Sequence, residues 1–149
     1  MALLAIMAGL PGAALIVATA TMLLALPFGV DPVWRVEPLS LPEAAALRDA
    51  GEVLRLINGG GDPDVPGTVR GYFLRNDAVV VTPLEAAVAA DRTDVLEVLL
   101  DNGASLDAPT MTRLICFARA IEADGAGAFL QEQRPADVPA SCEHVQTPW

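Results

Sequence analysis

The stretch TPLEAAVAADRTDVLEVLLDNGASLDA, Thr82 to Ala108, contains two short apolar segments separated by a polar break. Thr82-Pro83 is typical of a helix start, because threonine caps the first turn and proline already has a helical φ at the first position. Apolar residues then recur at helical spacing on both sides of the break. The second segment ends at Asn102-Gly103, a pair that tolerates left-handed backbone. The stretch therefore predicts a helix, a tight turn, an antiparallel helix and a loop.

Two further segments repeat this pattern. AAALRDAGEVLRLINGGGDPD, residues 44–64, aligns on the stretch without gaps and places Gly60 43 residues before Gly103. TRLICFARAIEADGAGAFLQEQRPAD is a weaker copy that starts at Thr112, 30 residues after Thr82. Gly125 and Gly127 each weaken its second helix by up to about 1 kcal/mol relative to alanine, so we expect a marginal terminal unit.

The middle unit resembles the ankyrin repeat, whose first helix begins with the pattern T-P-L-H-x-A. Thr82, Pro83 and Leu84 match this pattern, Glu85 stands where the family has histidine, and VLEVLLDNGASLDA matches the second helix and its ending. The resemblance implies an all-α, ankyrin-like helix-turn-helix solenoid. Its three repeats would cover residues 41–64, 82–108 and 112–137, followed by an irregular Pro-rich tail at 138–149.

The first repeat interval is longer than the usual repeat of about 33 residues, and the surplus falls at residues 65–81. Within it, Val69–Leu74 and Ala78–Val81 have strand composition around the turn cluster Arg75-Asn76-Asp77. The resemblance places a projecting loop, or finger, between repeats. We therefore expect an extended β-hairpin finger between repeats 1 and 2.

Residues 1–30 contain no charged side chain, and all 9 basic and 19 acidic residues follow them. A membrane-spanning helix needs about 20 mostly apolar residues, so we predict a single-pass N-terminal transmembrane anchor and a linker at 31–40. A cleaved signal peptide is the first alternative, although no basic residues precede the apolar run; a buried core helix is the second. The charges leave the membrane side of the repeat domain open, with a slight preference for the extracytoplasmic face.

The remaining composition argues against several functions. Every basic residue is arginine and the net charge is −10, so no basic patch is expected to bind nucleic acid. The single histidine, His144, lies in the tail, away from any serine or cysteine nucleophile. Cys142, Glu143 and His144 do not supply the three or four converging ligands of a zinc site. We expect no enzyme activity, no cofactor, no metal and no small-molecule substrate.

Seven residues are the candidate partner-binding site. Aromatic and arginine side chains are the usual anchors of interfaces, and the finger carries both kinds; the alternative is that one of its aromatics packs on the helices. Ankyrin-like arrays also bind through the first helices and the turns that follow them, although a solvated acidic face is the simpler interpretation there. The seven are Arg70, Tyr72, Phe73, Arg75, Glu85, Asp91 and Arg92.

Two cysteines are too few for a disulfide scaffold. Cys116 falls in the first helix of the third unit, where a buried free thiol is the simpler expectation. A Cys116–Cys142 disulfide that ties the tail back is the alternative.

The sequence thus favours a membrane-anchored, ankyrin-type protein–protein interaction module. The partner would be a membrane protein or complex, or a basic soluble protein drawn to the acidic surface. A second hypothesis is a small accessory or structural subunit of a membrane complex. In that case small residues of the leader, such as Gly9 and Gly12, would permit close packing among transmembrane helices.

Overall fold

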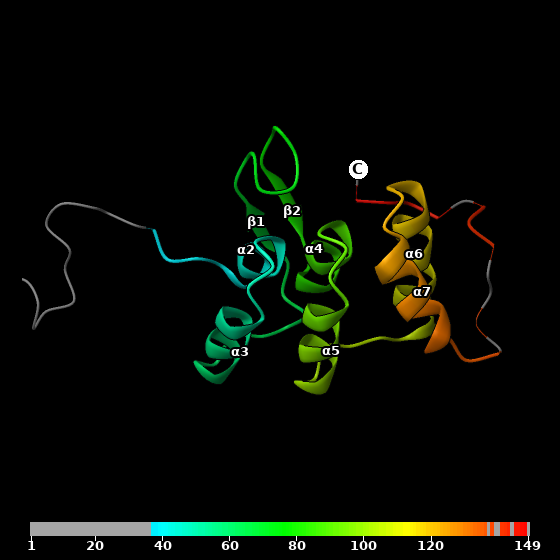
Figure 1. Ribbon diagram of the computed structural model, residues 1–149, viewed down its shortest axis with the longest axis horizontal. Coiled ribbons are helices and arrows are strands. Elements are labelled where there is room, and N and C mark those ends of the chain that lie inside the picture. Colours follow the sequence, from blue (N-terminus) through cyan, green and yellow to red (C-terminus); the bar gives the residue numbers. More distant parts are fainter. Residues whose placement is uncertain (1–36, 137, 139–140, 144, 149) are drawn as a thin grey trace, which may run out of the picture. The chain divides into compact units, whose positions relative to one another are not determined.

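The computed structural model of the chain describes residues 37–136, 138, 141–143 and 145–148. This part is mostly helical, with one small two-stranded antiparallel sheet (Figure 1). Its elements all belong to one compact unit, Leu39–Trp149. The elements, in chain order, are α2 (Leu41–Ala46), α3 (Ala50–Asn58), β1 (Gly67–Val69), β2 (Val79–Val81), α4 (Pro83–Ala89), α5 (Thr93–Asp101), α6 (Ala108–Ala120) and α7 (Asp124–Glu132).

The six helices form three successive pairs, each joined by the same tight turn (Figure 1). In every turn one residue has a left-handed backbone, at Arg48, Asp91 and Glu122 with φ of 66°, 52° and 60°. The amide after that residue then donates to a carbonyl five positions back, which closes the end of the first helix. These three hydrogen bonds run from Asp49 N to Ala44 O, from Arg92 N to Ala87 O and from Ala123 N to Ala118 O.

The helices contact one another in two rows. The first helix of each pair packs on the next first helix, so α2 contacts α4 and α4 contacts α6. The second helices do the same, with α3 against α5 and α5 against α7. Alanines allow the first helices to approach closely, because Ala44, Ala45, Ala86 and Ala87 are fully buried.

The core between these rows is built from larger side chains of the second helices and α6. Val53 lies on α3, Leu96 and Leu99 on α5, and Leu114 and Phe117 on α6, all with no exposed surface. The pattern that predicted amphipathic helices in the sequence therefore gives the buried face of each pair.

The finger is shorter as a sheet than predicted. β1 pairs with β2 from Gly67↔Val81 to Val69↔Val79, whereas we expected strands at Val69–Leu74 and Ala78–Val81. Pairing stops where Val69 is buried and Arg70 turns toward α2. Residues 70–78 instead form a turn-rich loop that extends beyond the ends of α2 and α4 (Figure 1).

The third pair also begins earlier than expected. We predicted a start at Thr112, but Asp107 caps α6 through a 2.9 Å hydrogen bond from Thr110 N, so the helix already runs from Ala108. The second helix, α7, forms despite its glycines. Gly127 packs closely on α6, where an added Cβ would lie 3.6 Å from the Cβ of Ala118.

The predicted membrane anchor at residues 1–30 lies outside the described residues. Among the residues that the structure does describe, no helix has both the length and the apolar character needed to cross a bilayer.

Candidate functional site

Two helices that border the finger begin with the same reciprocal cap. Ser40 accepts from Glu43 N at 3.4 Å, while Ser40 N donates to Glu43 Oε2 at 3.1 Å. Thr82 and Glu85 repeat the arrangement at 3.2 Å and 2.8 Å. The sequence spacing S-x-x-E and T-x-x-E is the signature of this capping box. Its first copy is a signal that the sequence prediction did not use.

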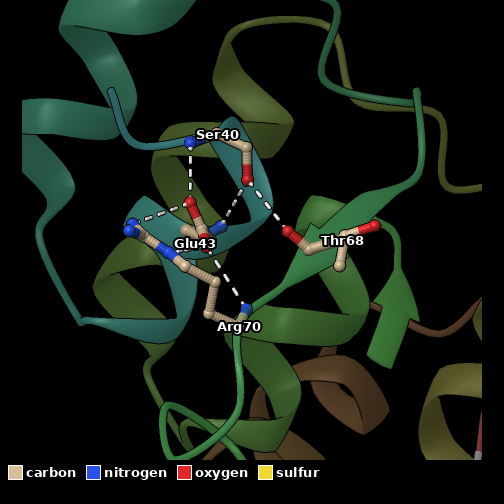
Figure 2. A network of polar contacts seen from close by, with 4 residues as sticks. All are labelled: Ser40, Glu43, Thr68 and Arg70. Atoms are coloured by element: carbon tan, nitrogen blue, oxygen red, sulfur yellow. Dashed lines mark hydrogen bonds and ion pairs between the residues drawn. The ribbon is translucent and has the colours of Figure 1, made fainter. Parts of the chain in front are cut away.

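Glu43 also fastens the finger to α2 (Figure 2). Although only 4% exposed, it accepts from Arg70 Nε at 2.6 Å, from Arg70 Nη2 at 3.2 Å and from Arg70 N at 3.2 Å. Burial alone would raise the pKa of the Glu43 carboxyl. The hydrogen bonds from the Arg70 side chain and from the Ser40 and Arg70 amides, together with the Arg70 charge, bring that pKa below its ordinary value.

Glu85 has the corresponding role one unit further along. It is 5% exposed, and Arg113 Nη1 on α6 lies 3.0 Å from its Oε1. Glu85 stands where the ankyrin family has a histidine, and it links its own helix pair to the next through this ion pair. Because the carboxylate is buried against protein, Glu85 has little surface left to offer a partner.

Asp91, another candidate, caps a helix of the next pair. Its Oδ1 accepts from Ala126 N at 2.7 Å in the first turn of α7, a helix that has no side-chain cap of its own. A carboxylate at this position also favours the helix dipole. Gly125 leaves the necessary room, because a Cβ there would lie 3.1 Å from Asp91 Oδ1. The glycine that weakens α7 in isolation therefore admits the cap that secures it.

Replacing Asp91 with alanine should destabilise α7 by removing this cap. Alanine is also strained in the left-handed backbone of residue 91, so Glu122→Ala, at the equivalent turn, is the matched control. Relative to that control, we expect Asp91→Ala to cost about 1 kcal/mol more in urea unfolding, together with faster exchange of the Ala126 amide. Equal losses in the two variants would remove Asp91 from the role of cap.

Arg92 is held by a neighbouring side chain. Its Nε donates to Asp94 Oδ1 at 2.7 Å, and a second bond joins Arg92 Nη2 to Asp94 Oδ2. Both side chains remain partly exposed, at 37% for Arg92 and 48% for Asp94. The Arg92 hydrogen bond, with its positive charge, lowers the pKa of Asp94 below its ordinary value in spite of partial desolvation.

The two finger aromatics have different environments. Phe73 packs against the core, and the Arg70 guanidinium lies over its ring at 5.2 Å from the centroid. Tyr72 is 86% exposed and has a left-handed φ of 72°, with its amide donating to Arg75 O at 2.6 Å. A side chain on Gly71 would clash with Asn76 O, at 2.6 Å from an added Cβ. The loop thus buries one aromatic and presents the other, beside the exposed Arg75.

The candidates therefore separate into two groups. Arg70, Phe73, Glu85 and Asp91 make internal contacts that hold the finger or the helix pairs, whereas Tyr72 and Arg75 lie together at the exposed tip. Sequence reasoning missed Glu43 and Arg113, the two residues that complete the ion pairs. His144 lies outside the described residues. Within the described part, no group of three or more His, Cys, Asp and Glu residues could hold a metal ion.

Comparison with protein-family models, curated proteins and solved structures finds no match to this chain.

Proposed function

We propose that this chain is a membrane-anchored protein–protein interaction module of ankyrin type, which contacts its partner through the tip of the finger. The observation that carries the proposal is the exposure of Tyr72, at 86% of its surface, on a loop anchored at its base by the Glu43–Arg70 pair. Exposed tyrosines supply large contact area and lose little conformational entropy on binding. A rigid base under such a side chain further reduces the entropic cost of binding.

Two features of the fold support the ankyrin-type part of the proposal. The three helix pairs share one turn geometry, and the first and second helices pack in separate rows. The projecting hairpin lies between the first and second pairs, the position at which ankyrin repeats carry their fingers. Each pair buries its apolar face against a neighbour, as expected for stacked repeats.

The apolar residues 1–30 support an anchor, and the disulfide between Cys116 and Cys142 supports an extracytoplasmic repeat domain. Disulfides persist in oxidising compartments and are rare in the cytosol. An anchor confines the search for a partner to the membrane surface and so raises its effective concentration. The net charge of −10 favours a partner with a basic surface, either a membrane protein or a soluble protein held near the bilayer.

The finger can be tested by photo-crosslinking in native membranes. With benzoylphenylalanine in place of Tyr72, we expect crosslinking to one protein partner, whereas the same probe at Val65 should recover about tenfold less. Val65 is a suitable control because it is 56% exposed and precedes β1. Tyr72→Ser should then reduce co-purification of that partner while the helical circular dichroism is unchanged. Equal recovery from both positions, or unaltered binding by Tyr72→Ser, would argue against the finger as the contact.

A further inference from the structure

The C-terminal tail, the segment after Gln133, returns to α6 and is covalently joined to it. The disulfide connects Cys116 in the middle of α6 with Cys142 in the tail, 26 residues later in the sequence. Cys116 is only 5% exposed, whereas Cys142 is partly accessible. The bond therefore has one sulfur buried in the helical core and one at the surface.

The tail makes few other contacts with the helices. Val138 is 5% exposed and belongs to the core, with its carbonyl accepting from Arg134 Nη1 at 2.9 Å. Val145 lines an apolar pocket together with Ala108, Pro109 and Thr112 at the start of α6. No helix or strand holds the described tail residues after Gln133. Two apolar side chains, one on each side of the disulfide, therefore provide much of the packing that would remain if the bond were opened.

Arg119 lies beside the accessible sulfur. It follows Cys116 by three residues on α6, so the two side chains share one helix face. Its Nη1 is 3.7 Å from Cys142 Sγ, and the guanidinium is exposed. A positive charge at this distance would stabilise a Cys142 thiolate once the bond is reduced. Stabilising the reduced form makes a disulfide easier to reduce at equilibrium.

We propose that the Cys116–Cys142 bond is a reversible redox latch that holds the tail on α6. A dithiol reductant supplies the two electrons: its first thiolate attacks Cys142 Sγ, the S–S bond breaks, and Cys116 leaves as a thiolate that takes up a proton. The second thiol then attacks the mixed disulfide, so the reductant becomes a disulfide and Cys142 is released as a thiolate facing Arg119. Reduction frees the tail and uncovers the α6 surface beneath Val138 and Val145.

The latch can be tested on the full chain in mild detergent, equilibrated in buffers of reduced and oxidised glutathione. Thiols trapped with a mass-tagged maleimide report the ratio at which half the protein is reduced. We expect Arg119→Gln to require a ratio about threefold more reducing than the unchanged chain. Arg55→Gln, an exposed arginine on α3, is the matched control and should leave the midpoint unchanged.

Hydrogen exchange measures the release of the tail independently. The Val138 amide donates to Pro135 O at 3.1 Å in the oxidised chain, and we expect its exchange to become about tenfold faster on reduction. Cys142→Ser should match the reduced chain under oxidising conditions, with the helical circular dichroism retained in both. Unchanged Val138 exchange would overturn the latch, as would thiols that stay unpaired at every glutathione ratio. An unaltered midpoint in Arg119→Gln would overturn the role of Arg119.

Discussion

Replacing Leu99 with alanine is expected to lower the free energy of unfolding by about 2–5 kcal/mol. Leu99 has no exposed surface and lies on α5, the second helix of the central pair, which contacts both α3 and α7. Truncating it removes apolar contacts and leaves a cavity between neighbouring pairs. Because each pair buries its faces only against its neighbours, the loss is expected to spread to all three pairs.

Urea unfolding followed by circular dichroism measures this loss, with Leu54→Ala as the control. Leu54 is 40% exposed on α3, so the same substitution there removes fewer buried contacts. We expect its cost to be below about 1 kcal/mol, as for many surface positions. A loss of that small size at Leu99 would contradict its place in the core.

Replacing Glu43 with glutamine is expected to destabilise the fold by about 2 kcal/mol near neutral pH, since hydrogen bonds to a charged acceptor are stronger than neutral ones. Glu43 is 4% exposed and accepts from two backbone amides and the Arg70 side chain. A glutamine amide keeps one acceptor and turns a donor toward groups that also donate. The base of the finger should loosen, with faster exchange of the Arg70 amide.

The cost of this substitution should depend on pH. The pKa of Glu43 is lowered in the folded chain, where Arg70 and the amides outweigh the effect of burial. Its ionised form therefore contributes stability that is complete above its unfolded pKa and is lost as the pH falls through the folded pKa. The stability difference between the unchanged chain and Glu43→Gln should be constant from about pH 5 to 8 and should shrink below about pH 4.3.

Glu52→Gln is the matched control for this measurement. Glu52 also pairs with an arginine and also has a lowered pKa, because its hydrogen bond to Arg55 outweighs slight desolvation. The pair lies on the surface of α3, where water screens it, so its removal should change stability less. Equal losses at Glu43 and Glu52, or a Glu43 difference that persists in acid, would contradict the buried ion pair.

Local sequence was sufficient to predict much of the helical part. Thr82-Pro83, the alanine pairs and Asn102-Gly103 predicted a helix start, a slim helix and a helix end, and α4 and α5 lie at those positions. These signals depend on the backbone preferences of residues within one or two turns. The same rule explains the early start of α6, since Asp107 is a capping residue that the alignment on Thr112 passed over.

The finger strands were less predictable. Val69 to Leu74 has strand composition, yet pairing ends at Val69 because Arg70 is drawn to Glu43, 27 residues earlier in the chain. Which of the adjacent aromatics would be buried could not be decided from their identity either. The left-handed backbone of Tyr72 and the close passage of Gly71 past Asn76 turn one ring outward and the other onto the core.

The sequence by itself determined where the helices begin and end, the three-fold repetition and the acidic, lysine-free surface, because each depends on composition or on neighbours a few residues apart. Only the tertiary structure decided which polar residues are internal. Glu85 meets Arg113, Asp91 caps α7, and Cys116 joins Cys142 across separations of 26 to 35 residues. Such contacts are fixed by the stacking of one pair on the next, which no local pattern encodes.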